Sequence, residues 1–117
     1  MKREHQELLR RLALNDEGAL ATLLGTSLAA TGPGGLDART AALVRLAALV
    51  ALESASASYQ WCVAGALAAG ATDDEVVGVL SVLAPVVGVP RVSSAAPEVA
   101  LAIGCDLGRP PDPPGGA

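Results

Sequence analysis

The stretch from Ala38 to Leu52, ARTAALVRLAALVAL, restricts the possible fold more than any other part of the chain. Its apolar residues occupy nearly every face of a helix, and the only polar interruptions are Arg39, Thr40 and Arg45. A helix that is apolar all round has to be covered on all sides. Complete coverage within one subunit is difficult in a chain of 117 residues, which is the usual size of one domain. We therefore expect a central helix that packs partly against another copy of the chain.

The composition favours an all-α fold. Apolar residues make up 51% of the chain, but aromatic residues make up only 2% and phenylalanine is absent, so the core has to be built from Ala, Leu and Val. Ala and Leu are among the strongest helix formers. We predict a single helical domain over residues 1–104, with about five or six helices. The Pro/Gly-rich tail over residues 105–117 is expected to be disordered.

Two short helices are predicted ahead of the central one. Residues 2–14 place leucines at helical spacing among charges, and Glu7 stands one turn before Arg11, which predicts an ion pair. Asn15, followed by two acidic residues, is expected to cap a second helix that ends at the run TGPGG. The residues that this helix turns inward are predicted to be Leu20, Leu23, Leu24 and Leu28. Asp37 is the expected N-cap of the central helix.

The C-terminal half contains clear helix boundaries. A helix within residues 54–70 is expected to end at Gly70, and Thr72 and Glu75 form a capping box that starts the next helix. Pro85 is expected to kink or end that helix. A Gly-Val-Pro turn then precedes a last helix over residues 93–103.

Charge and composition argue against several classes of function. A formal net charge of −4 without a cluster of Lys or Arg makes nucleic acid an unexpected partner. One His and two distant Cys give no ligand set for a metal, and no cofactor is predicted. The uncharged stretches 18–36 and 54–71 are interrupted by Gly, Ser and Thr, so neither is expected to span a membrane. Since the N-terminus has no apolar leader and Cys62 and Cys105 form no CxxC pair, we expect a cytoplasmic protein with reduced thiols.

Cys62 is the residue with the greatest potential for chemistry. It follows Tyr59 by three positions, so the two share a helix face, and Trp61 is its neighbour. Tyr59 and Cys62 are therefore the candidate catalytic residues, although a cysteine among Ala and Val also acts as a small hydrophobe and both roles stay open. Arg45 needs a partner, either Glu53 in an ion pair or the carboxylate of a ligand in an apolar pocket. The candidate substrate-binding residues are Arg45, Glu53 and Trp61, and packing remains the alternative role of Trp61.

The run CVAGALAAGATDDEVVGVLSVLAPVVGVP, preceded by LDARTAALVRLAALVAL, resembles the carboxymuconolactone decarboxylase family, which includes the alkyl hydroperoxidase D-like proteins. The resemblance covers about residues 36–102 and rests on the order and spacing of helix starts and ends. It implies an all-α, alkyl hydroperoxidase D-like helical bundle that assembles into homotrimers or homohexamers. It also implies sites near the subunit interfaces.

The resemblance gives Cys62 a specific meaning. In the decarboxylase branch a histidine that handles a proton stands eight residues before the helix-ending glycine, and this chain has Cys62 there. The same branch carries a glutamate and a tyrosine where this chain has Gly78 and Val86. In the hydroperoxidase branch a CxxC precedes the histidine, and its two positions are Ala55 and Ser58 here, so that disulfide mechanism is absent from the segment.

Three functions follow as alternatives. The first is a lyase-like enzyme that acts on a small organic acid or lactone, with Cys62 and Tyr59 in place of the family histidine. A cysteine can transfer a proton or act as a nucleophile when its pKa is lowered. The second is a non-catalytic oligomeric binding or scaffold member of the fold. The third is a redox protein in which Cys62 is oxidised and then reduced by an outside thiol.

Overall fold

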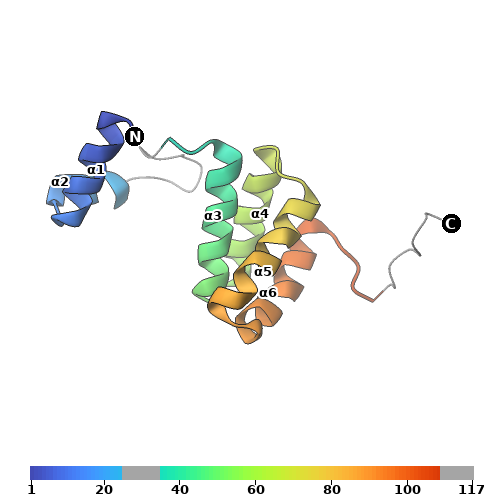
Figure 1. Ribbon diagram of the computed structural model, residues 1–117. Helices are drawn as coiled ribbons and strands as arrows, with labels where there is room; N and C mark the ends of the chain where they lie inside the picture. Colours follow the sequence, from blue (N-terminus) through green and yellow to red (C-terminus); the bar gives the residue numbers. More distant parts are fainter. Residues whose placement is uncertain (25–34, 109–117) are drawn as a thin grey trace.

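The computed structural model describes residues 1–24 and 35–108 of the chain. Within these residues it contains six helices and no strand, which confirms the expected all-α fold (Figure 1). The helices are α1 (Arg3–Ala13), α2 (Glu17–Leu24), α3 (Ala38–Ala51), α4 (Ser56–Ala68), α5 (Asp73–Val87) and α6 (Val89–Ile103). None of the described helices combines the length and apolar character needed to cross a membrane.

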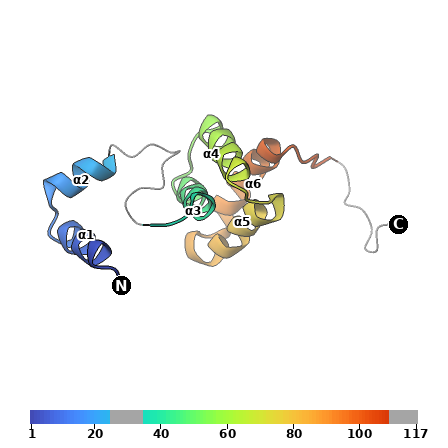
Figure 2. The same cartoon turned by 90° about the horizontal axis from the view of Figure 1, so that it is seen from above.

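Helices α3 to α6 form a four-helix bundle in which α3 contacts each of the other three (Figure 2). The side chains that are fully buried at its centre are Leu46, Val50, Val63, Val76 and Val99. Small residues fill the space between them, with Ala42, Ala66 and Ala95 in the same core cluster. Because most of this core consists of small and aliphatic side chains, the helices can pack closely, as the composition predicts.

The predicted caps of the bundle helices are present. The Asp37 carboxylate accepts a hydrogen bond from the Thr40 amide at 2.7 Å at the start of α3. At the start of α5 the Thr72 hydroxyl accepts from the Glu75 amide, and the Glu75 carboxylate accepts from the Thr72 amide, each at 3.0 Å. The capping box is thus confirmed, and Gly70 adopts a positive φ of 99° after α4, as a helix-ending glycine does.

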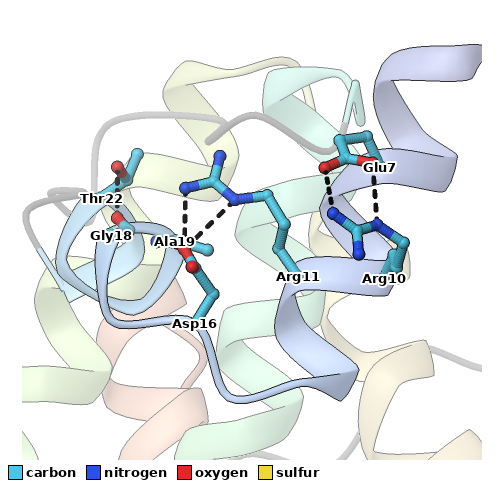
Figure 3. Close-up of polar contacts among 7 residues, drawn as sticks. All are labelled: Glu7, Arg10, Arg11, Asp16, Gly18, Ala19 and Thr22. Carbon is cyan, nitrogen blue, oxygen red and sulfur yellow. Dashed lines mark hydrogen bonds and ion pairs between the residues drawn. The ribbon is translucent and has the colours of Figure 1, made fainter.

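The ion pair and the cap predicted for the two helices ahead of the bundle are formed by other residues (Figure 3). Glu7 binds Arg10 at 3.0 Å rather than Arg11, which instead binds Asp16 at 2.8 Å. Asp16 also accepts a hydrogen bond from the Ala19 amide, so Asp16 and not Asn15 caps α2. Asn15 has a φ of 57° and forms the turn, and this turn brings Asp16 within reach of Arg11. Leu28 and most of the TGPGG run lie outside the described residues.

The expected end of a helix at Pro85 and the expected start of the last helix near residue 93 are both corrected. Helix α5 continues through Pro85 to Val87, and α6 begins at Val89 rather than near residue 93. A proline in the first turn of a helix costs little, because the amide that it lacks would have no partner within the helix. Pro90 is therefore compatible with the start of α6, and the reversal between the helices is made at Gly88, where φ is 95°.

Helices α1 and α2 lie away from the bundle (Figure 1). Helices α1 and α2 contact each other, and among the described residues neither contacts α3, α4, α5 or α6. After α6, Gly104 adopts a left-handed conformation and residues 105–108 are exposed. Residues 109–117 of the predicted tail lie outside the described residues, and the single-domain assignment stays a prediction.

Candidate functional site

Cys62 lies on the buried face of α4, against α3. Its exposed fraction is 7%, and its thiol donates a hydrogen bond to the Ala42 carbonyl with an Sγ–O distance of 3.6 Å. Burial raises the pKa of the thiol, and the positive charge of Arg45 opposes part of that rise. Arg45 follows Ala42 by three residues, so both lie on nearby parts of the α3 surface. The uncharged thiol is therefore the favoured form of Cys62 in this fold.

Tyr59 shares the buried face with Cys62, as the spacing predicts. Its side chain is 3% exposed, and its hydroxyl donates a hydrogen bond to the Leu49 carbonyl near the end of α3, at 3.2 Å. Burial raises the pKa of the hydroxyl, and the negative charges of Glu53 and Glu98 raise it further. Tyr59 and Cys62 thus each donate a hydrogen bond to the backbone of α3, at carbonyls two helical turns apart.

The three predicted substrate-binding residues lie in different surroundings. Arg45 is half-buried on α3 and acts on the Cys62 thiol through its charge. Trp61 points outward from α4 with 67% of its surface exposed, because it precedes Cys62 by one residue and faces away from the core. Glu53 lies beyond the end of α3, exposed, with a φ of 54°. It follows the C-cap Leu52, so it does not continue the helical face that carries Arg45.

The structure contains a groove between α3 and α5 that the sequence did not predict. It measures about 380 Å³, and its walls include Leu43, Val44, Val79 and Val82. At one end the Arg39 guanidinium binds the Glu75 carboxylate at 2.9 Å. The one sequence signal for this groove was the excess of apolar residues on the central helix. Val44, one of these residues, stays 54% exposed in the groove wall.

The positions that the resemblance associates with polar residues do not meet in this groove. Gly78 lines it, and a Cβ at Gly78 would meet nothing within 4 Å, so the glycine helps to keep it open. Cys62 and Val86 do not line it, and Val86 is exposed near the end of α5. Residues 1–24 and 35–108 also hold no group of three or more His, Cys, Asp or Glu side chains placed to bind a metal ion.

Comparison with known proteins supports the family resemblance. The sequence model of the carboxymuconolactone decarboxylase family matches residues 17–101, from the start of α2 almost to the end of α6. The chain belongs to this family. No curated protein and no solved structure matches the chain. The family resemblance stated from the sequence is thereby confirmed, and it extends to α2, which the motifs quoted above did not include.

Membership of the carboxymuconolactone decarboxylase family does not by itself assign a reaction. The fold places Cys62 and Tyr59 together and Arg45 within electrostatic reach of the thiol. It leaves Trp61 on the outside of α4 and Glu53 at the end of α3. The candidate residues therefore form a buried pair with one nearby cation, and the roles assigned to them stay predictions.

Proposed function

We propose that this chain is a non-catalytic, self-associating member of the carboxymuconolactone decarboxylase family that serves as a binding or scaffold protein. The observation that carries the proposal is the state of Cys62. The thiol at the family's proton-handling position is buried, donates a hydrogen bond to the Ala42 carbonyl and has a raised pKa. A general acid or base needs access to the substrate and a pKa near the working pH.

The surroundings of Cys62 support the same function. Tyr59, the other candidate catalytic residue, uses its hydroxyl on the Leu49 carbonyl. Both side chains join α4 to α3, which is a packing role. Self-association into a homotrimer or homohexamer is part of the proposal, because apolar residues such as Val44, Trp61 and Val82 are exposed on the bundle. The proposal includes a small organic acid as a ligand of such an assembly, with the Arg45 cation contributing to its binding.

The test compares the full chain with a Cys62→Ala variant. Release of carbon dioxide from a carboxylated lactone, and consumption of an organic hydroperoxide in the presence of a dithiol, are measured for both proteins. We expect neither protein to exceed the uncatalysed rate, and Cys62→Ala to lower the free energy of unfolding by about 1 kcal/mol through lost packing. Turnover by the natural chain that Cys62→Ala abolishes, with the oligomer unchanged in mass, would overturn the proposal.

One observation favours the lyase-like enzyme as a second candidate. The charge of Arg45 lowers the pKa of Cys62 against the effect of burial, as a residue that activates a thiol would. The ultraviolet absorbance of the thiolate, followed against pH in a Cys105→Ser background, separates the two candidates. A thiolate that forms near neutral pH and is lost in Arg45→Gln supports the enzyme, whereas one that forms only at alkaline pH supports the non-catalytic function.

A further inference from the structure

The hairpin of α1 and α2 has an apolar side that the described part of its own bundle does not cover. None of the α1 residues is buried, and Leu8 and Leu12 of α1 are only half-buried, as are Leu20 and Leu23 of α2. The Arg11–Asp16 salt bridge joins α1 to the residue that caps α2, whereas the Glu7–Arg10 salt bridge lies within α1 (Figure 3). Helices of 11 and 8 residues are too short to be stable on their own in water. The hairpin therefore requires a surface to pack against.

The groove between α3 and α5 offers an apolar surface of matching character. Val44 of α3 and Val82 of α5 form part of its walls and are 54% and 76% exposed. Gly78 adds no side chain to its floor. The apolar leucines of α1 or α2 would remove these valines from water, at a gain of about 25 cal/mol for each Å² of apolar surface buried.

The start of α1 and the start of α5 carry charges of opposite sign. Lys2 and Arg3 place positive charge at the start of α1 beside the single carboxylate of Glu4, and in the described residues no ion pair neutralises Lys2 or Arg3. Asp73 and Asp74 gather negative charge in the first turn of α5, next to the Glu75 end of the groove. An α1 helix lying in the groove with its start beside the start of α5 would bring the opposite charges together.

The position of α1 against Gly35 favours the groove of a second copy over the groove of the same chain. The first turn of α1 lies against Gly35, just ahead of α3, where a Cβ on Gly35 would be 3.0 Å from Cε1 of His5. From this contact the hairpin extends away from the bundle (Figures 1 and 2). To reach its own groove the hairpin would have to abandon the contact between His5 and Gly35. A second copy can be reached while that contact is kept.

We propose that the α1–α2 hairpin of one copy docks in the α3–α5 groove of a second copy. The proposal rests on the self-association stated above and names the surfaces that carry it. It does not depend on the chemistry of Cys62. Because each copy has both a hairpin and a groove, the exchange is either reciprocal between two copies or continued around a closed ring.

The first test is the mass of the full chain by sedimentation velocity across the micromolar range, for the natural chain, Val44→Glu and Leu101→Glu. Leu101 is the matched control, because it is an apolar residue on α6 that is 65% exposed, against 54% for Val44, and does not line the groove. We expect a multiple of 11.6 kDa for the natural chain and Leu101→Glu. A carboxylate in the groove should weaken assembly of Val44→Glu by at least about tenfold, with unchanged helix content by circular dichroism.

The second test identifies the docked segment. Leu9 is a leucine of α1 that is 58% exposed, so a thiol placed there can reach a second copy. In a Cys105→Ser background, a Leu9→Cys preparation is mixed with a Val82→Cys preparation and oxidised gently. We expect disulfide-linked pairs between the two preparations to exceed pairs within either one. A monomeric natural chain would overturn both the proposed self-association and the docking. An oligomer that Val44→Glu leaves intact, or that both glutamate variants disrupt, or in which the mixed pairs are not enriched, would overturn the docking alone.

Discussion

Replacement of Glu53 by glycine should make the protein more stable. Glu53 follows α3 in the left-handed region, with a φ of 54°. Its amide donates to the Val50 carbonyl at 3.2 Å, and the next amide, that of Ser54, donates to the Leu49 carbonyl at 3.1 Å. This pair of hydrogen bonds is the Schellman arrangement, which favours glycine at the position of Glu53.

The end of α4 provides an internal comparison, because the same arrangement there contains glycine. Gly70 has a φ of 99°, and its amide donates to the Leu67 carbonyl at 3.1 Å. The following amide, that of Ala71, donates to the Ala66 carbonyl at 2.9 Å. The two helix ends therefore have the same hydrogen bonds, but only the end of α3 has a side chain in the strained position.

The magnitude follows from two opposing effects. A residue with a Cβ in the left-handed region costs roughly 1–2 kcal/mol. Replacement by glycine also gives the unfolded chain more conformational freedom, which offsets about 0.5–1 kcal/mol of the relief. The net gain of Glu53→Gly in the free energy of unfolding is thus about 0.5–1 kcal/mol, and the corresponding rise in Tm is about 2–6 °C for a domain of this size.

Circular dichroism during thermal and urea unfolding measures the change. Glu53→Gln is the matched control, because it keeps the Cβ and removes the charge, and it should leave Tm nearly unchanged. Gly70→Ala should lower the free energy of unfolding by about 1 kcal/mol, since it places a Cβ in the same strained conformation. A rise in Tm for Glu53→Gln as large as that for Glu53→Gly would refute the reasoning, because the charge and not the backbone would then be responsible.

Three further predictions concern side-chain contacts. Tyr59→Phe should cost about 1 kcal/mol or less in urea unfolding, because the Leu49 carbonyl keeps the Ser54 amide as its donor, and a loss several times larger would contradict this. Thr72→Ala should lower the free energy of unfolding by about 1 kcal/mol through loss of the capping box, and an unchanged urea midpoint would contradict it. Amide hydrogen bonds from Thr40 and from Thr72 hold the pKa of Asp37 and of Glu75, respectively, below the ordinary value. These pKa values are lower in the folded than in the unfolded chain, so the two carboxylates make their whole contribution to stability at a pH above their unfolded pKa values. That contribution is lost as the pH falls through their folded pKa values. The Tm should therefore drop below about pH 4. Asp37→Asn should make that drop shallower, and an identical drop would contradict the assignment.

The parts of the fold that were predicted correctly depend on residues close together in sequence. The Asp37 cap and the box of Thr72 and Glu75 each involve a contact over three residues, so composition and spacing suffice to find them. The length of the central helix was found for a similar reason, because its apolar run has no break before Leu52. Val44 also remains exposed in the described structure, in agreement with a helix that one subunit does not fully cover.

The parts that were missed depend on how the chain turns. Arg11 binds Asp16 and not the predicted Glu7, because the left-handed Asn15 brings Asp16 back toward α1. The depth of Cys62 was not readable from α4, whose Ala and Gly residues surround the helix and give its faces little contrast. Spacing predicted that Tyr59 and Cys62 share a face, but only packing against α3 shows that this face is the buried one.

The most direct measurement of the central claim is the rate at which Cys62 is alkylated in the folded protein. In a Cys105→Ser background the modification of Cys62 by iodoacetamide is followed by mass spectrometry between neutral and alkaline pH, with and without urea. If Cys62 serves packing, the folded protein should react at least about 100-fold more slowly than the unfolded chain, because the thiol is reached only when the bundle opens. Alkylation of the folded protein at neutral pH as fast as in urea, or faster, would show an accessible thiol and would contradict the account.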